Sequence, residues 1–288
     1  MKVRLYLYCV VLSGLLCAAA CSKVERSLAA SGTPIAIIGH GGMGFITVEN
    51  NIPPNSMASL RRAIEGYNAD GVEVDVQLSA DSVLMLFHDQ SLLTSSNCVG
   101  CVAEQGAEAL ENCRYRNDIA ANVFSSERLI RLEDFVRRMA QRQVPPKIIL
   151  DAKTFFNCSQ SPVEAYLGRF ARATADLIRQ YEAEEWIFVE SADLFFIQQL
   201  NRLNAQIKII FAGSWSRSQQ EELLSYSIYG WSFQEGRVTE EQLAQVRAAG
   251  WRVALWNVLT RKELVDAVNQ QPELIYTDNI PLLQEILR

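Results

Sequence analysis

Residues 71–77 read Gly-Val-Glu-Val-Asp-Val-Gln, and they guide the interpretation of the whole chain. Valine occupies every second position, at 72, 74 and 76, which indicates a β-strand in largely apolar surroundings. Side chains two residues apart on a strand point to the same face, so Glu73 and Asp75 project together. Buried carboxylates need partners, and a bound cation satisfies two of them at once. The pattern therefore predicts a buried strand that carries a cation site.

Strand-like apolar runs alternate with amphipathic helix candidates along the chain. The expected strands are Ile35–Gly39, Val72–Gln77, Lys147–Asp151, Trp186–Ser191, Ile207–Ala212, Ile228–Phe233, Arg252–Val258 and Leu274–Thr277. The expected helices are Ser56–Tyr67, Leu132–Arg142, Pro162–Glu182, Ala192–Leu203, Glu240–Gly250 and Arg261–Asn269. Eight strands with intervening helices favour an α/β fold, a (β/α)8 TIM barrel over residues 34–288. A doubly wound open sheet is the alternative, but no glycine-rich phosphate motif opens a helix after the first strand.

The first 20 residues predict a signal peptide. A basic start at Lys2 and Arg4 is followed by mostly apolar residues 5–16 and by three alanines before Cys21. The apolar run is short for the roughly 20 residues that span a membrane. Small residues directly before a cysteine resemble a bacterial lipoprotein signal, which implies acylation of Cys21 and a tether over residues 21–33. We therefore expect a lipid-anchored protein of the bacterial cell envelope, with ordinary secretion as the alternative.

The charge of the chain excludes one class of partner. Without Lys2 and Arg4 the chain carries 25 basic and 33 acidic residues, a net charge of −8. This acidity argues against nucleic acid as the partner. It also does not help binding to an anionic lipid surface by charge, and we expect membrane contact through the N-terminal lipid anchor.

Four cysteines follow Cys21, and an exported compartment favours disulfides between them. They are Cys98, Cys101, Cys113 and Cys158, which allow three pairings. Zinc binding or a redox pair at Cys98 and Cys101 are alternatives, but zinc lacks a second close pair of ligands. Three of these cysteines lie in residues 90–128, which are loop-like apart from a short helical patch near Ala103–Asn112. We expect a small insertion over one barrel mouth, either a stapled surface loop or a lid over the substrate.

The chain has only two histidines, and each follows a strand-like run. His40 comes after Ile35–Gly39 and before two glycines, and His88 comes after Val83–Phe87 and before Asp89. Working groups of barrel enzymes lie at the carboxyl ends of strands. We therefore expect both histidines at one mouth, together with Glu73, Asp75, Asp151 and Lys153. Two imidazoles around paired carboxylates suit acid–base chemistry beside a cation.

Taken in order, these motifs resemble the glycerophosphodiester phosphodiesterase family from Ile37 to the C-terminus. The family's His-Arg-Gly, Pro-Glu-Asn-Thr, Glu-x-Asp-Val and His-Asp correspond to His40-Gly41-Gly42, Pro53-Pro54-Asn55-Ser56, Glu73-Val74-Asp75-Val76 and His88-Asp89. Its Glu-x-Lys, Gly-x-x-Val-x-x-Trp-Thr-Val and closing Thr-Asp correspond to Asp151-Ala152-Lys153, residues 250–258 and Thr277-Asp278. Ordered motifs at suitable spacing are a much stronger signal than the two histidines alone.

The resemblance implies a TIM barrel with one divalent cation, Ca²⁺ or Mg²⁺, held by Glu73, Asp75 and Asp151. Hard oxygen donors without thiolate or imidazole suit such ions. It also implies His40 and His88 as general acid and base, with the order of the two roles left open. Imidazoles with an ordinary pKa near 6.5 exchange protons readily near neutral pH.

The resemblance also suggests substrate-binding residues. Lys153 is expected to place a point charge on the phosphate, or else to form an ion pair with Asp151. Trp256 is expected to offer a flat wall to the alcohol portion. From its position at the end of the fourth strand, and not from the resemblance, Glu190 is expected either at the substrate site or as a hydrogen-bonding group inside the barrel. Asp278 is expected to secure the end of the last strand.

Three positions depart from the family pattern. Gly41 replaces an arginine that binds phosphate, Pro54 replaces an acid, and Asp151 is one methylene shorter than the family's glutamate. The expected reaction is hydrolysis of a glycerophosphodiester to an alcohol and glycerol phosphate. A lipid-directed phosphodiesterase, phospholipase-like or sphingomyelinase D-like, is the first alternative, and a non-catalytic ligand-binding barrel is the second.

Overall fold

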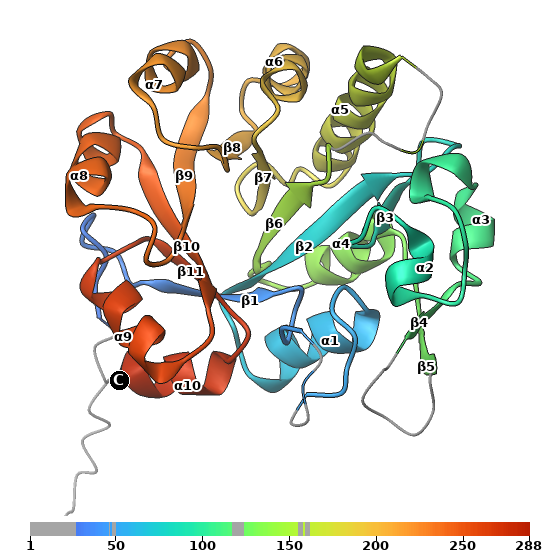
Figure 1. Cartoon of the computed structure of the whole chain (residues 1–288), viewed down its shortest axis with the longest axis horizontal. Coiled ribbons are helices and arrows are strands. Elements are labelled where there is room, and N and C mark those ends of the chain that lie inside the picture. The colour runs from blue at the N-terminus through green and yellow to red at the C-terminus, as the bar shows by residue number, and fades with distance from the viewer. Residues whose placement is uncertain (1–26, 46, 48–49, 117–123, 155–157, 159–161) are drawn as a thin grey trace, which may run out of the picture.

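Eight parallel strands form a closed barrel in the computed structural model, which describes residues 27–45, 47, 50–116, 124–154, 158 and 162–288 (Figure 1). The strands are β1 (Ala36–His40), β2 (Gly71–Leu78), β6 (Lys147–Ala152), β7 (Ile187–Ser191), β8 (Lys208–Phe211), β9 (Ile228–Gln234), β10 (Arg252–Val258) and β11 (Leu274–Thr277). Each strand pairs with its neighbours, and β1 pairs with both β2 and β11, which closes the sheet. The predicted (β/α)8 TIM barrel is confirmed, and the open sheet is excluded.

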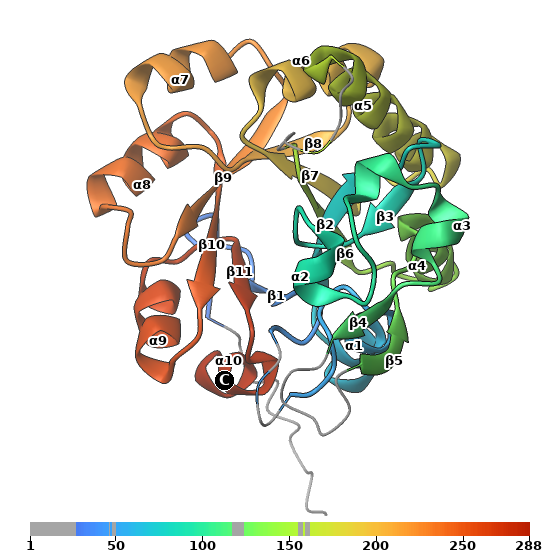
Figure 2. The same cartoon turned by 45° about the vertical axis from the view of Figure 1, so that its right-hand side comes forward.

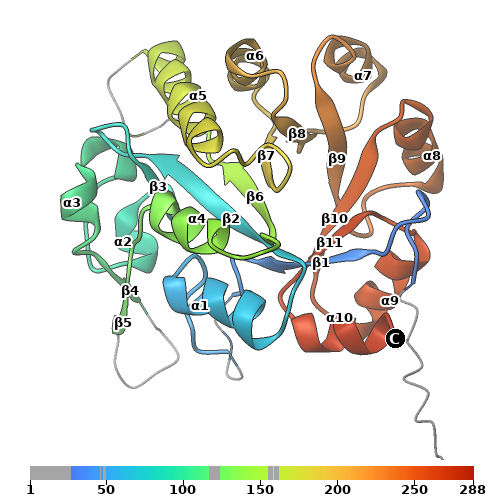
Figure 3. The same ribbon diagram turned by 180° about the vertical axis from the view of Figure 1, so that it is seen from behind.

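Helices follow the strands and cover the outside of the barrel (Figures 1 and 3). They are α1 (Met57–Arg61), which continues into a π-helical turn over Arg62–Gly66, α4 (Leu132–Ala140), α5 (Val163–Gln180), α6 (Leu194–Leu203), α7 (Arg217–Leu223), α8 (Glu240–Ala248), α9 (Arg261–Asn269) and α10 (Ile280–Ile286). Capping boxes at Thr239 and Thr260 start α8 and α9, because each threonine side chain and a residue three positions later bond reciprocally. No helix in these ranges is long and apolar enough to cross a membrane.

Successive side chains of β2 point alternately to the core outside the barrel strands and to the interior of the barrel. Val72, Val74 and Val76 belong to the large apolar core that also contains the buried faces of the helices. The interior of the barrel is a smaller apolar cluster, with Ile38, Ile149, Phe188, Ile210 and Tyr276 among its members. Because successive side chains of a strand point to opposite faces, Glu73 and Asp75 project into the barrel.

The segment just before β1 is packed on the barrel. The amide of Ser27 donates to the carbonyl of Leu287, and the amide of Ala30 donates to the carbonyl of Gln271. Ala29 is buried, and Leu28 forms a bridge with Pro34. Within the predicted tether over residues 21–33, Ser27 and Ala30 therefore have backbone partners on the barrel. The predicted signal peptide and Cys21 lie outside the described residues.

The insertion lies beside β2 and has its own core (Figures 1 and 2). It follows β3 (Leu84–Leu86), which is antiparallel to β2. It contains α2 (Leu92–Ser95), a 3₁₀ turn (Val102–Glu104), α3 (Ala107–Leu110), β4 (Arg114–Arg116) and β5 (Phe124–Arg128), so it is more regular than the predicted loop. Its core gathers Met85, Phe87, Leu92, Val102, Leu110, Cys113, Tyr115 and Leu129.

Two disulfides hold the insertion in place. Cys98–Cys113 closes the insertion on itself, and Cys101–Cys158 ties it to the loop after β6. The predicted structural disulfides are confirmed, and the structure selects one of the three pairings that the sequence allowed.

Candidate active site

A cavity of about 380 Å³ opens at the carboxyl ends of the barrel strands. All the residues predicted for catalysis, metal binding and substrate binding line this one cavity: His40, Glu73, Asp75, His88, Asp151, Lys153, Glu190 and Trp256. Phe45, Ala212, Asn257 and Tyr276 complete the wall. The structure therefore brings together residues that are spread over more than 200 positions of the chain.

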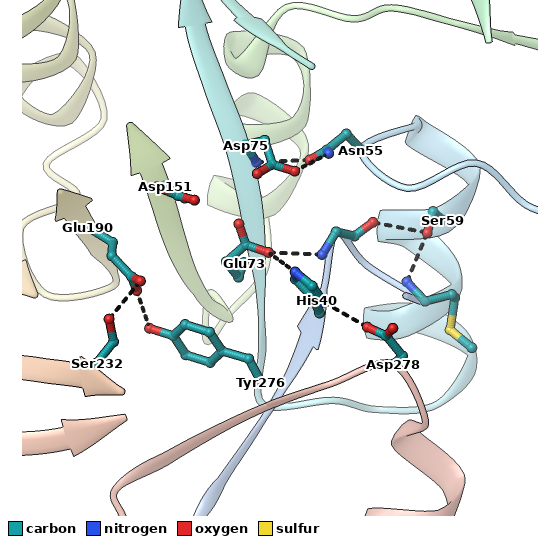
Figure 4. A network of polar contacts seen from close by, with 12 residues as sticks. His40, Asn55, Ser59, Glu73, Asp75, Asp151, Glu190, Ser232, Tyr276 and Asp278 are labelled. Carbon is teal, nitrogen blue, oxygen red and sulfur yellow. Dashed lines mark hydrogen bonds and ion pairs between the residues drawn. The ribbon is translucent and has the colours of Figure 1, made fainter. Parts of the chain in front are cut away.

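Three carboxylates form the acidic centre of the cavity (Figure 4). Glu73 and Asp75 lie on β2, and Asp151 lies directly beside Asp75 on β6. One oxygen from each of the three groups lies within 4.8 Å of the other two. Glu73 and Asp75 are almost fully buried. Converging carboxylate oxygens, with no thiolate or imidazole among them, are the donor set that Ca²⁺ and Mg²⁺ prefer.

The charges of this centre are not balanced by the residues around it. Lys153 Nζ lies 2.7 Å from Asp75 Oδ1 and 2.5 Å from Asp151 Oδ2, and His40 Nε2 lies 3.9 Å from Glu73 Oε2, so one ammonium and one imidazole face three acids. Burial raises the pKa of Glu73 and of Asp151. Burial also acts against ionised Asp75, yet Lys153, His88 and the hydrogen bond from Asn55 together outweigh it and hold the pKa of Asp75 below its ordinary value. A divalent cation would offset this excess of acid, so the residues present fit such an ion.

Asn55 holds Asp75 through both ends of its amide (Figure 4). Its Oδ1 accepts from the Asp75 amide at 2.9 Å, and its Nδ2 donates to Asp75 Oδ2 at 2.6 Å. The backbone of Asn55 is left-handed, with φ of 61°, a conformation that asparagine tolerates better than most residues. The sequence motif contained Asn55, but its contact with Asp75 depends on the tertiary structure.

His40 is held between two acids. Its Nδ1 lies 2.7 Å from Asp278 Oδ1, and its Nε2 lies 3.9 Å from Glu73 Oε2. Burial lowers the pKa of His40, but the hydrogen bond with Asp278 and the charge of Glu73 outweigh it and raise that pKa to about 9. The prediction that Asp278 secures the end of the last strand missed this role, because β11 ends at Thr277 and the Asp278 side chain turns to His40.

His88 has a separate carboxylate partner. Its Nδ1 lies 3.0 Å from Asp89 Oδ1, and the hydroxyl of Ser95 donates to the other oxygen of Asp89. The hydrogen bond with Asp89 raises the pKa of His88, while partial burial acts in the opposite direction. His88 is more open to solvent than His40, with 44% of its side chain exposed against 22%.

Phe45 lies between the two histidines, and sequence reasoning missed it. Its ring centroid is 5.0 Å from that of His40 and 5.9 Å from that of His88, and both contacts are edge-on. Phe45 is 45% exposed although it is large and apolar. The signal that could have found it is its position five residues after His40, in the loop that leaves the first strand.

Glu190 is held in the wall of the cavity by two hydrogen bonds. Both oxygens of Glu190 accept hydrogen bonds, from Ser232 Oγ at 2.8 Å and from the Tyr276 hydroxyl at 2.7 Å (Figure 4). Burial and the charge of Asp151 raise the pKa of Glu190 to about 7. These contacts match the prediction of a hydrogen-bonding group inside the barrel, although Glu190 also lines the cavity.

Two departures from the family pattern are in contact with each other. A Cβ added at Gly41 would lie 2.7 Å from Pro54 Cβ, and Gly41 has φ of 54°. The amide of Gly41 donates to Glu73 Oε2 at 3.0 Å. The chain therefore has a backbone amide and a proline ring where the family pattern has an arginine and an acid.

Known proteins share both the sequence pattern and this fold. The model of the glycerophosphoryl diester phosphodiesterase family matches residues 48–282. This chain belongs to that family. The predicted family and its reaction class, hydrolysis of phosphoric diesters, are thereby confirmed. A glycerophosphodiester phosphodiesterase of Caldanaerobacter subterraneus is 21% identical over 244 residues, which cover 83% of this chain and 93% of that protein.

Solved structures agree with the barrel. A glycerophosphodiester phosphodiesterase from Parabacteroides distasonis superposes with a TM-score of 0.70 at 21% identity, over 88% of this chain and 96% of that one. A phosphodiesterase from Oleispira antarctica, in complex with the product sn-glycerol-3-phosphate, superposes with a TM-score of 0.71 at 18% identity, over 87% and 96% of the two chains. At these identities the superpositions establish the fold.

Proposed function

We propose that this protein hydrolyses glycerophosphodiesters to an alcohol and glycerol phosphate, with one divalent cation, Ca²⁺ or Mg²⁺, held by Glu73, Asp75 and Asp151. The observation that carries the proposal is the convergence of three buried or half-buried carboxylates and two histidines on one cavity. The glycerol phosphate bound to the Oleispira relative supports the choice of product.

The two histidines flank the acidic centre and supply the proton transfers. When bound, the cation offsets the negative charge that develops on the phosphoryl oxygens. His40 and His88 each give or take a proton at the attacking or leaving oxygen, and they exchange these roles between steps. Asp278 holds Nδ1 of His40, so Nε2 is the nitrogen left to face the cavity. Asp89 holds His88 in the same manner.

The remaining wall residues bind and orient the substrate. Lys153 forms ion pairs with Asp75 and Asp151, and in this proposal its ammonium also contacts a phosphate oxygen of the substrate. Trp256 offers a flat apolar surface to the alcohol portion, and Glu190 stays bonded to Ser232 and Tyr276. The missing family arginine at Gly41 leaves Lys153 as the one lysine or arginine among the residues that line this cavity.

The test is release of glycerol phosphate from glycerophosphocholine and glycerophosphoethanolamine with Ca²⁺, Mg²⁺ or EDTA. We expect metal-dependent turnover that falls at least about 100-fold in His40→Ala and in His88→Ala. The exposed substitution Lys262→Ala serves as a control and should keep full activity. Turnover that survives EDTA, or a His40→Ala variant that keeps its rate, would contradict the mechanism. Turnover of intact phosphatidylcholine in place of these diesters would favour the lipid-directed alternative.

We also propose that the protein is anchored to the bacterial cell envelope through an acylated Cys21. The support is the order of a basic start, an apolar run and three alanines before that cysteine. In a bacterial host, Cys21→Ala should release the protein from the membrane fraction, while Cys17→Ala, inside the predicted signal peptide, should not. Equal release, or no release, in both variants would contradict the proposed anchor.

A further inference from the structure

A second cavity of about 310 Å³ adjoins the first on the side of the insertion. Phe45 and His88 line both cavities, so these two side chains form the boundary between them. The walls of the second cavity come from the loop before α1, from the residues that follow β3 and from the insertion, which contributes Thr94, Ser95, Tyr115 and Arg116. No residue of the acidic centre lines it.

The wall on the insertion side is part of a packed core. Tyr115 is 3% exposed, and its hydroxyl donates to the carbonyl of Leu86 at 3.0 Å. The rings of Tyr115 and Phe87 lie 6.0 Å apart. The backbone of the following residue, Arg116, pairs with Phe124 in the β4–β5 ribbon. This side of the cavity is therefore built by buried contacts.

The charged groups of this cavity differ in whether they already have partners. Asp89 is bonded to His88 and to Ser95. The Nε atom of Arg116 is buried and has no hydrogen-bond partner among the described residues. A guanidinium presents parallel N–H groups that match a carboxylate, and it gains most from an anion where apolar walls exclude water. The aromatic rings and prolines of this cavity provide such walls.

We propose that this second cavity receives the alcohol half of the diester and selects an alcohol that carries a carboxylate, which Arg116 binds. The inference rests on the proposed function, because the alcohol enters this cavity only if the phosphodiester lies between the two histidines. One guanidinium matches the single charge of a carboxylate. The two charges of a phosphate would leave one charge unpaired close to Asp89.

Glycerophosphoserine and glycerophosphoethanolamine test the proposal, since the two head groups differ by one carboxylate. The value of kcat/KM is measured for both substrates in the wild type, Arg116→Gln, Arg114→Gln and Arg237→Gln. Arg114 is the exposed arginine two residues earlier on β4. Arg237 lines a separate cavity next to Trp256, on another part of the same mouth.

We expect the wild type to prefer glycerophosphoserine by about tenfold, and Arg116→Gln to bring this ratio close to one. Arg114→Gln should keep the ratio. A wild type without preference overturns the proposal. An equal loss of kcat/KM for both substrates in Arg116→Gln assigns Arg116 to the scissile phosphate and overturns the proposal. A change of the substrate ratio in Arg237→Gln places the head group in the other cavity and also overturns the proposal.

Failure of the proposed function gives a different result from failure of this inference. If no diester is hydrolysed, the proposed function is wrong, and calorimetric binding of the same two diesters to the same four proteins replaces turnover. Tighter binding of glycerophosphoserine that only Arg116→Gln removes still supports the second cavity as a carboxylate site. Equal binding of the two diesters, or none, overturns it.

Discussion

Asp278, which is 238 positions away in the sequence, is the hydrogen-bond partner of His40 Nδ1. Asp278 fixes the imidazole through Nδ1 and stabilises its protonated form, while Asn55 does the corresponding work for the Asp75 carboxylate. Neither residue is proposed to touch the reacting atoms. Both are positioning residues, and their effects can be measured apart from those of the histidines and acids.

Asp278→Asn should lower the pKa of His40 from about 9, because the substitution removes a negative charge that stabilises the imidazolium. The chain has two histidines, so NMR titration of an untagged, EDTA-treated protein should resolve both. Activity should fall by roughly 100-fold or more, since the imidazole also loses its orientation. Asp266→Asn, on an exposed helix face, should change neither value. An unaltered His40 titration in Asp278→Asn would show that this contact does not set the pKa.

Asn55→Ala should weaken binding of the divalent cation by about 10- to 100-fold, because partners behind a metal ligand orient it. Calorimetric titration of the EDTA-treated protein with Ca²⁺ or Mg²⁺ measures the affinity. Asn112→Ala, in the insertion, is the matched control and should bind as the wild type does. Equal affinities in the three proteins would mean that Asp75 needs no support from Asn55.

At the scale of elements, the two ends of the segment that joins β1 to α1 lie against each other. We call these ends, residues 41–43 and 53–56, the fitted pair. Gly42 also lies close to α1, where an added Cβ would come within 2.7 Å of Ser59 Oγ. The Ser59 hydroxyl donates to the carbonyl of Gly41, and the amide of Met43 donates to that hydroxyl (Figure 4). The loop that follows His40 is therefore shaped by the start of α1.

Gly41→Arg, which restores the family's residue, should destabilise the protein by about 1–3 kcal/mol. The added Cβ would meet Pro54, and arginine is strained at φ of 54°. Urea denaturation measures the loss. Gly41→Arg combined with Pro54→Gly should recover part of the stability, because the Cβ at position 54 that causes the clash is removed while the backbone strain at position 41 stays. Gly168→Arg, at a helix position with open space around it, should stay within about 0.5 kcal/mol of the wild type. A fully stable Gly41→Arg variant would contradict the fitted pair.

At the scale of the whole molecule, closure of the barrel concentrates acid in one buried place. Burial raises the pKa of Glu73, Asp151 and Glu190, so their neutral forms are favoured in the folded state. Their contribution to stability is present at low pH and is lost as the pH rises through the raised values. Asp75, whose pKa is lowered, contributes in the opposite direction.

A bound divalent cation should therefore stabilise the fold, and more strongly at pH 7.5 than at pH 5. At 100 times the dissociation constant, linkage gives about 2.7 kcal/mol. Thermal unfolding with saturating Ca²⁺ or Mg²⁺, compared with EDTA, measures the gain at both pH values. Glu73→Gln should lose most of the gain, and Glu285→Gln, on the exposed face of α10, should keep it. A gain that is equal at both pH values would contradict the role of the raised carboxyl pKa values.

The local pattern of the chain determined the barrel, the two histidines, the three acids and the insertion. Alternation of valine and acid places Glu73 and Asp75 on one face of a strand, and strand ends of a barrel share one mouth, so these features follow from short-range rules. The contacts of Asp278, Asn55 and Phe45, the place of Arg116 in the second cavity and the pairing of the disulfides were decided only by the tertiary structure. These features depend on segments that are far apart in the chain or that lie in loops. The distance between such segments, and the direction of their side chains, depend on how the barrel closes.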